Sequence, residues 1–442
     1  MKRFNLITLF LFLLHTHTTH AKLMDITTFT LSNGLEVAVI ENHKAPVILQ
    51  KLYYIAGSIN VPKGKGGIAH LLEHMMFRGT KKVPDKVFNQ LTEEHGAENN
   101  AYTTYNETAY YEFTDISKLE LMMALEADRM RGLNIDKQAF ITERDIVLQE
   151  RLQRFETNPI PLFYETIQKI LWQDHPIANP VSGSIAEIKS LTVQDAKNFY
   201  NRYYQPNNAI LVLSGDIDIK TAKTLTQKYY EKIPSSEHKD IIYLSTPKPI
   251  KTQMNIQLPG VEQPRYVEYT RLQANEFSKT DITALDILTE YLTGDDSSYL
   301  YNKLVYKDKS LLSIGANVSY EEKLGGAFSI YAIPVSPAQT IQSIQTLIDT
   351  NIQQALTNLT QEKLDKIKNQ TLSNAVYLQE NPETSASFVG SMLISGYTTD
   401  EIRNYDKIIL SITLEDIHNA WSKVISSPAK VSGYLQGDTP NE

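Results

Sequence analysis

The sequence contains no cysteine, and this absence narrows the kinds of site that the protein can build. Disulfide bridges and thiolate ligands are excluded, so a bound metal ion has to be held by nitrogen and oxygen atoms. An excess of positive charge is also missing, since 51 acidic residues outnumber 43 basic ones and give a formal net charge of -8. This charge balance argues against a nucleic-acid partner.

Long apolar runs are absent after the first residues of the chain. These residues are basic at Lys2 and Arg3, almost wholly apolar over Phe4–Leu14, and end in a polar stretch closed by Ala21. The apolar run of about eleven residues is short for a membrane span, and the pattern is typical of a cleaved export signal. We therefore expect residues 1–21 to be removed and the rest, without a membrane span, to be secreted or periplasmic. An uncleaved anchor is the alternative.

An internal repeat predicts two halves built on one plan. Ser190–Asp195 matches Ser411–Asp416 at an offset of 221 residues, and each copy runs on through an apolar segment to a Gly-Asp pair. A Thr followed three residues later by Asp resembles a helix cap, so each half should end in a helix and a strand. Chance similarity between two amphipathic segments is the alternative. The length of 442 residues agrees with two domains.

A polar stretch near Pro234–Pro249 predicts the break between the halves. We expect a metal-binding catalytic domain at residues 22–235, a linker at 236–250 and a non-catalytic domain of the same fold at 251–442. The hydrophobic fraction of 42% and the charged fraction of 21% are those of a globular protein.

Strand and helix patterns follow one another in mixed order in both halves. Strand character is found at Leu35–Glu41, Val47–Ala56, a Tyr- and Thr-rich hairpin at Asn100–Phe113, Arg265–Leu272, Ala316–Tyr320 and Phe328–Pro334. Helical patterns run from a cap at Asp85 to Gly96, follow a capping box of Ser117 and Glu120, and cover Thr280–Thr293 and Thr340–Leu356. The mixed order predicts an α+β layer fold.

The segment His70-Leu71-Leu72-Glu73-His74 carries the chemistry. The spacing of four residues places both imidazoles on one helix face, about one turn apart, where they can bind one ion. Glu73 lies beside this face and can take a proton from water held by the metal, so the segment predicts a hydrolytic zinc site. A pair of surface histidines beside an unrelated acid is the alternative.

A catalytic zinc site needs a third protein ligand. The remaining histidines are scattered singly and are interpreted as structural or surface residues: His43, His95, His175, His238 and His418. Thr142–Glu150 is predicted to be a helix that opens at Thr142, with Glu143 and Glu150 on one face. Either acid could be the ligand while the other orients a histidine, and a solvated surface position is the alternative for each.

These residues resemble the pitrilysin or insulinase family of inverted-motif zinc metallopeptidases, including bacterial members of about this length and the mitochondrial processing peptidase. The resemblance covers nearly the whole chain after the export signal, and its further motifs are Ala56-Gly57-Ser58, Phe77-Arg78-Gly79-Thr80, Asn100-Ala101-Tyr102-Thr103-Thr104, Glu107-Thr108-Ala109-Tyr110, Glu143-Arg144, His175-Pro176, Pro180-Val181-Ser182-Gly183 and Tyr204-Gln205-Pro206-Asn207-Asn208-Ala209. It selects Glu150, 76 residues after His74, as the third ligand and Glu143 as its support.

The resemblance implies two α/β sandwich halves, one zinc ion in the first half, and endopeptidase activity with Glu73 as the general base. Asn100, Ala101, Tyr102 and Thr103 would form an exposed strand to which an extended peptide adds. An ordinary buried hairpin is the alternative for this strand. For the protein as a whole, the alternatives are a peptide-binding or assembly subunit without turnover and a metal-storage or delivery protein.

The second half departs from the family at a carbonyl clamp. Many self-sufficient members carry an Arg and a Tyr one heptad apart that hydrogen-bond the substrate carbonyl. Val305 and Leu312 occupy these positions here, and neither side chain can donate a hydrogen bond. We therefore expect a heterodimer with a paralogue that supplies Arg and Tyr, or otherwise a homodimer. A misalignment, with Tyr299, Tyr301 and Tyr306 nearby, is the alternative.

Overall fold

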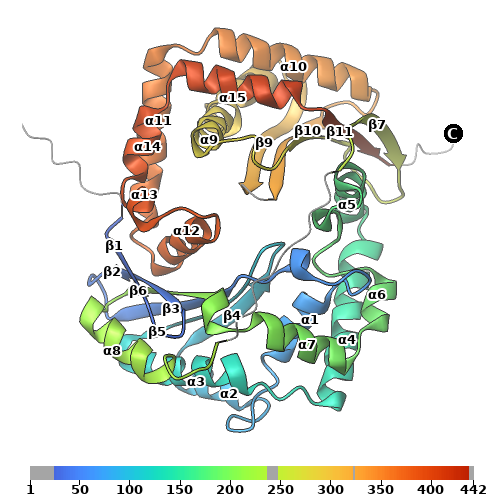
Figure 1. Cartoon of the computed structure of the whole chain (residues 1–442). Helices are drawn as coiled ribbons and strands as arrows, with labels where there is room; N and C mark the ends of the chain where they lie inside the picture. Colours follow the sequence, from blue (N-terminus) through green and yellow to red (C-terminus); the bar gives the residue numbers. More distant parts are fainter. Residues whose placement is uncertain (1–23, 236–246, 322–323, 438–442) are drawn as a thin grey trace, which may run out of the picture.

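The computed structural model describes residues 24–235, 247–321 and 324–437 (Figure 1). The predicted export signal at 1–21 and most of the predicted linker at 236–250 lie outside the described residues, so both stay predictions, as do the domain bounds. Among the described helices, none combines the length and the apolar character that a membrane span requires.

The first half contains a mixed sheet of six strands in the order β1-β2-β6-β3-β5-β4. Its strands are β1 (Ile26–Thr30), β2 (Glu36–Glu41), β3 (Val47–Tyr54), β4 (Glu98–Thr103), β5 (Thr108–Asp115) and β6 (Ala209–Gly215). Its helices are α1 (Ile68–Met75), α2 (Val87–Glu94), α3 (Leu119–Gly132), α4 (Lys137–Arg151), α5 (Pro159–Trp172), α6 (Ile185–Ser190), α7 (Val193–Tyr203) and α8 (Ile219–Tyr229).

The second half contains a mixed sheet of five strands in the order β7-β11-β8-β10-β9. Its strands are β7 (Ile250–Gln257), β8 (Arg265–Leu272), β9 (Leu311–Glu321), β10 (Gly325–Pro334) and β11 (Ala429–Gln436). Its helices are α9 (Lys279–Thr293), α10 (Ile341–Thr357), α11 (Gln361–Leu378), α12 (Pro382–Ile394), α13 (Thr399–Arg403), α14 (Tyr405–Ser411) and α15 (Leu414–Ser426).

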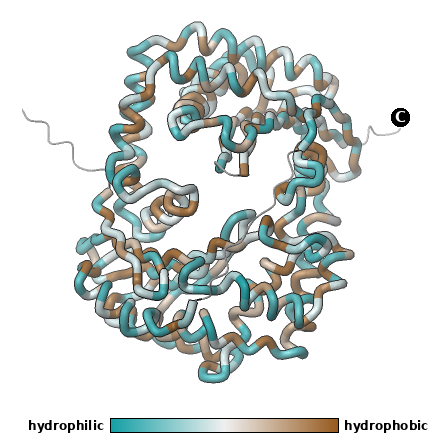
Figure 2. Tube along the Cα trace, in the orientation of Figure 1, coloured by the Kyte–Doolittle hydropathy of each residue, from teal (hydrophilic) through white to brown (hydrophobic). Residues whose placement is uncertain are grey.

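The second sheet repeats the order of β2-β6-β3-β5-β4 in the first, which confirms the predicted α+β class and the two homologous halves. In each sheet the strand nearest the end of its half, β6 or β11, is parallel to one neighbour and antiparallel to the other. The predicted repeat forms the helix before that strand, since α7 and α15 both begin with a capping box, Thr192 with Asp195 and Thr413 with Asp416. In Figure 2 hydrophilic and hydrophobic residues alternate along the helices at the outside of the molecule.

The halves exchange helices across their interface. One face of the first sheet is covered by helices of its own half, and the other packs against α12, where Ala386 and Val389 contact Tyr53 and Val212. In turn α5 of the first half packs on the second sheet, with Phe163 buried in the same cluster as Val431. Burying an apolar face of each sheet against the other half stabilises their association.

Three predicted helix starts are wrong. The residue before α2 is Lys86, in the left-handed region and without a side-chain cap, so Asp85 does not cap this helix. Ser117 lies in a short 3-10 turn capped by Asp115, and α3 begins after it. The helix predicted to open at Thr142 begins at Lys137, because Asp136 accepts the amides of Gln138 and Ala139. A backbone turn sets the start of α2 and of α3, whereas the side chain of Asp136 sets the start of α4.

Candidate metal centre

The helix α1 begins at Gly67, which has a φ of 86°. A Cβ there would lie 2.5 Å from the carbonyl oxygen of Ser182, so a side chain is excluded both by the backbone angle and by this close approach. Leu71, Leu72 and Met75 bury one face of α1 in the core of the first half. The remaining face carries the two histidines of the predicted metal motif.

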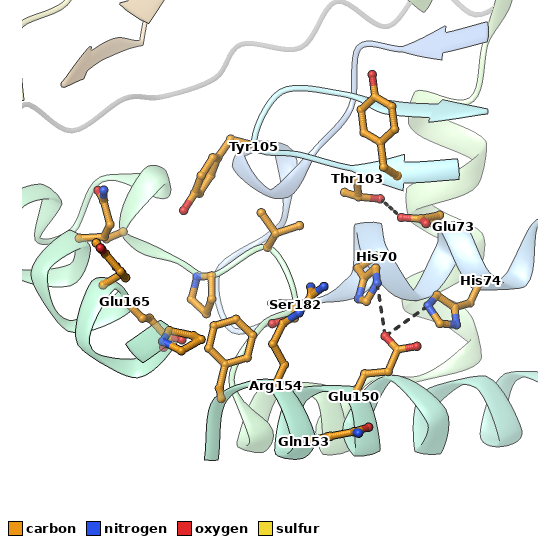
Figure 3. Close-up of a pocket in the computed structure, with 18 of the residues that line it drawn as sticks. His70, Glu73, His74, Thr103, Tyr105, Glu150, Gln153, Arg154, Glu165 and Ser182 are labelled. Carbon is orange, nitrogen blue, oxygen red and sulfur yellow. Dashed lines mark hydrogen bonds and ion pairs between the residues drawn. The ribbon is translucent and has the colours of Figure 1, made fainter. Parts of the chain in front are cut away.

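His70 and His74 point toward Glu150 of α4 (Figure 3). His70 Nε2 lies 3.8 Å and His74 Nε2 lies 3.7 Å from Glu150 Oε2, and one ligand atom from each residue falls within 4.8 Å of the others. Ligands that are each about 2 Å from one zinc ion lie within about 4 Å of one another, so this donor set of two imidazoles and a carboxylate fits zinc. Among the described residues, this is the single group of at least three potential ligands.

Glu143 lies behind His74. Its Oε2 is 3.0 Å from His74 Nδ1, and its other oxygen accepts from Arg78 Nε at 2.5 Å. Burial alone would raise the pKa of Glu143, but the hydrogen bonds to His74 and Arg78 lower it. The ionised carboxylate accepts the Nδ1 proton and leaves His74 Nε2 free to bind a metal, the usual arrangement behind a zinc-ligating histidine.

The pKa values of the two imidazoles are shifted in opposite directions. Burial, helped by His74 and Arg154, lowers the pKa of His70 to about 4, so His70 is neutral at pH 7 and its Nε2 can bind a cation. Burial opposes protonation of His74 too, but the hydrogen bond to Glu143 and the carboxylates of Glu150 and Glu73 raise its pKa. Cation binding at His74 therefore competes with a proton.

Glu73 projects from α1 toward β4, where Thr103 Oγ1 donates a hydrogen bond of 2.6 Å to its Oε2 (Figure 3). Burial raises the pKa of Glu73, and the bond from Thr103 offsets part of this effect. A carboxylate with a raised pKa beside a metal site is suited to proton transfer near neutral pH.

The strand β4 lies at the edge of the first sheet and, among the described strands, pairs with β5 alone. Ala101, Tyr102 and Thr103 line the cavity beside the potential metal ligands. The side chain of Asn100 instead accepts a hydrogen bond from the amide of Ala101. An edge strand next to a reactive group can pair with an extended peptide. The predicted binding role of these four residues remains a prediction.

A cavity of about 990 Å³ extends from the potential metal ligands toward α5. It is lined by His70, Glu73, His74, Ala101, Tyr102, Thr103, Tyr105, Glu150, Gln153, Arg154, Phe155, Pro161, Tyr164, Glu165, Gln168, Ala178, Pro180, Val181, Ser182 and Tyr269. The sequence interpretation missed the α5 side of this cavity and Tyr269 of β8, since neither carries a motif. The resemblance did include the segment 180–183 but gave it no role.

The positions of the expected clamp lie apart from this cavity. Val305 packs against the core of the second half, and Leu312 is 47% exposed at the start of β9. Nor do Tyr299, Tyr301 and Tyr306 line the cavity in the described part of the chain. The Tyr306 hydroxyl donates instead to Asp296.

The other histidines in the described residues, which were predicted to be structural or surface residues, lie outside the ligand group. His175 is buried against Trp172 and accepts a hydrogen bond from the amide of Ile177, and burial lowers its pKa to about 4. His43 is exposed and pairs with Asp216. His238 lies outside the described residues.

Comparison with known proteins identifies relatives of both halves. A family model described as insulinase (peptidase family M16) matches residues 36–184, and one described as the peptidase M16 inactive domain matches residues 190–371. The chain is 29% identical to a zinc protease, PqqE, of Helicobacter pylori, over 88% of this chain and 87% of that protein. It is 23% identical to a probable mitochondrial-processing peptidase subunit beta of Schizosaccharomyces pombe, over 90% and 88% of the two chains.

Solved structures agree with these matches. A protease from Helicobacter pylori has a TM-score of 0.86 at 26% identity, covering 93% of this chain and all of that one. The first half of the periplasmic protease PqqL from Escherichia coli has a TM-score of 0.77 at 19% identity, covering 94% and 93%. The predicted resemblance is confirmed, and the chain belongs to the insulinase family of peptidases, family M16.

Proposed function

We propose that the protein is a zinc-dependent endopeptidase that cleaves peptides or unfolded polypeptide segments. The observation that carries the proposal is the convergence of His70, His74 and Glu150 beside the Glu73 carboxylate and the edge strand β4. The name of the Helicobacter pylori relative, a zinc protease, supports the same activity.

Each residue has a role in this proposal. His70, His74 and Glu150 would hold the ion, and Glu143 keeps His74 in the orientation that binding requires. When bound, zinc would make a coordinated water more acidic and polarise the scissile carbonyl. Glu73 accepts the proton of the attacking water and returns it to the leaving amine. An extended peptide paired with β4 would present its backbone to Glu73.

The substitution Glu73→Gln tests the assignment of the base. The variant should bind about one zinc ion per chain, because Glu73 is outside the ligand group, yet lose at least about a hundredfold in cleavage of a quenched peptide. Elemental analysis and peptide cleavage measure the two properties separately. Equal cleavage by both proteins would remove Glu73 as the base, and wild-type protein without zinc would overturn the metal site.

We also propose a partner chain, because the positions of the expected clamp carry Val305 and Leu312. A paralogue with Arg and Tyr would complete the site, and an assembly subunit without turnover is the alternative function. The purified chain should then bind zinc and cleave slowly, and adding the paralogue should raise activity by about a hundredfold or more. Full activity as a monomer would remove the need for a partner.

Export to the periplasm or the medium is part of the proposal. It depends on the pattern of residues 1–21, and the likeness of the fold to that of a periplasmic protease from Escherichia coli supports it. Mass spectrometry of the mature amino terminus and fractionation of the producing cell would test it, and an intact segment on protein from the cytosolic fraction would contradict it.

A further inference from the structure

One cation in the cavity has no partner among the residues that the structure describes. Arg154 lies in the π-helical turn Leu152–Glu156, four residues after Glu150, and lines the cavity with an exposed side chain. In the described part of the chain no carboxylate lies within ion-pair distance of it, and no hydrogen bond to its guanidinium is formed. A guanidinium that faces a cavity without a partner is free to bind an anion.

The neighbouring arginine shows the contrast. Arg151 is buried, donates two hydrogen bonds of 2.6 and 3.1 Å to Glu165, and lies under the ring of Phe155 at 4.1 Å. Lys169 also donates to Glu165 over 2.7 Å. The carboxylate of Glu165, although it lines the cavity, is therefore already matched by two cations and does not neutralise Arg154. At this end of the cavity Arg154 is thus a cation that no described carboxylate neutralises.

Other polar groups line the same cavity. The hydroxyl oxygen of Ser182 is buried and has no hydrogen-bond partner among the described residues, and Ser182 lines the cavity together with Arg154. The side-chain amide of Gln153 also lines the cavity. A buried hydroxyl without a partner loses the free energy of a hydrogen bond, and a ligand oxygen at this place would restore it.

The position of Arg154 along the helix indicates how far from the cleaved bond it would contact a peptide. Arg154 follows Glu150 by four residues, which is at most about 6 Å along the helix axis, whereas an extended peptide advances about 3.4 Å per residue. If a peptide pairs with β4 and is cleaved beside His70, His74 and Glu150, an acidic group that lies one or two residues from the scissile bond would reach Arg154.

We propose that Arg154, with the hydroxyl of Ser182 and the amide of Gln153, binds a carboxylate of the substrate close to the scissile bond. The carboxylate belongs either to an Asp or Glu side chain or to the carboxyl terminus of the peptide. The inference rests on the proposed peptidase function, whose substrate class it narrows to peptides that carry a carboxylate close to the scissile bond.

Binding to the Glu73→Gln protein tests the subsite without any need for turnover. Fluorescence anisotropy would compare labelled peptides that differ only by Asp or Asn near the centre, all amidated at the carboxyl terminus, and neutral peptides with a free or amidated terminus. The acidic member of one pair should bind about tenfold more tightly. Arg154→Gln in the same background should abolish the difference, and Arg154→Glu should favour a Lys peptide.

The variant Arg144→Gln is the matched control, since it removes one positive charge from α4 at an exposed pair with Asp145 outside the cavity. It should keep the preference. Equal affinities within both peptide pairs, or a preference that survives Arg154→Gln, would overturn the subsite. Which pair shows the difference identifies the source of the carboxylate.

Cleavage of a proteome-derived peptide library adds an independent measurement. Wild-type cleavage sites should be enriched in Asp or Glu within two residues of the cut, or lie near carboxyl termini, and Arg154→Gln should lose this enrichment. A uniform loss of rate on all peptides would instead assign Arg154 to the scissile carbonyl and overturn the proposal. If the chain does not cleave at all, the peptidase function fails, while the binding comparison still decides the subsite.

Discussion

The hydroxyl of Thr103 donates a hydrogen bond of 2.6 Å to Oε2 of Glu73 and so connects the end of β4 to α1. Thr103 Oγ1 also lies 3.3 Å from the hydroxyl of Thr108, which donates to the carbonyl of Ala56 over 2.8 Å. Both hydroxyl protons are used in these two bonds, so it is the bond from Thr103 itself that holds the proposed base in one orientation. The strand expected to bind the peptide backbone therefore also positions the carboxylate that acts on it.

Thr103→Val should lower kcat about tenfold or more with little change in KM, because the side chain is similar in shape but cannot hold the carboxylate. Thr103→Ser restores the hydroxyl and should recover most of the rate. Steady-state kinetics on a quenched peptide measure both constants, and zinc content should stay at wild-type level in both variants. Equal rates for the Val and Ser variants would show that the hydroxyl does not matter.

Glu143→Gln should weaken zinc binding by about 10- to 100-fold, because the neutral amide no longer fixes the proton on Nδ1 of His74. Competition with a chromogenic chelator measures the affinity. Asp145→Asn, an exposed acid on the same helix, is the control and should bind zinc as the wild type does. An unchanged zinc affinity in the Glu143 variant would show that the carboxylate does not contribute to zinc binding.

Phe163→Ala tests the exchange of helices between the halves. Phe163 belongs to the first half but is buried against the second sheet, so the truncation should cost about 3–5 kcal/mol in the free energy of unfolding. Urea titration followed by circular dichroism measures the cost, and hydrogen exchange should increase in β11. Tyr377→Ala, which removes a ring that is 70% exposed, should change stability by less than about 0.5 kcal/mol. A loss confined to the first half would contradict the packing.

Local patterns predicted the parts of the fold that depend on local interactions. The periodicity of the apolar residues placed β3 and β8, and the paired capping boxes of Thr192 and Thr413 located the repeat. The spacing of His70 and His74 on one helix brought their rings together, as a helix of any surroundings would.

The remainder depends on contacts between segments that are far apart in sequence. Nothing in the apolar stripe of α5 distinguishes packing on its own sheet from packing on the other half. The hydrogen bond from Thr103 to Glu73 joins two motifs that lie 30 residues apart in the sequence. Tyr269 reaches the cavity from the second half. Arg154 belongs to no sequence motif. That it is unpaired among the described residues can be seen only in the structure, where Glu165 pairs with Arg151 and Lys169 instead.

Glu321 makes the contact between the halves depend on pH. Its side chain at the end of β9 accepts a hydrogen bond from Asn106 in the turn after β4. Burial, together with Glu107, raises the pKa of Glu321 to about 7. Below pH 4.5 the carboxyl is protonated in both the folded and the unfolded protein, and between pH 4.5 and about 7 only the folded protein keeps the proton.

Because the folded protein binds more protons in that interval, the contribution of Glu321 to stability falls as the pH rises through it and is fully lost above about 7. Glu321→Gln, which resembles the protonated form, should match the wild type near pH 4.5 and be more stable by about 1–2 kcal/mol at pH 8, after allowance for solvent screening. Urea titrations at a series of pH values measure this difference. Glu415→Gln, at an exposed position on α15, should show none. A difference for Glu321→Gln that stays constant with pH would mean that its carboxyl does not titrate in this interval.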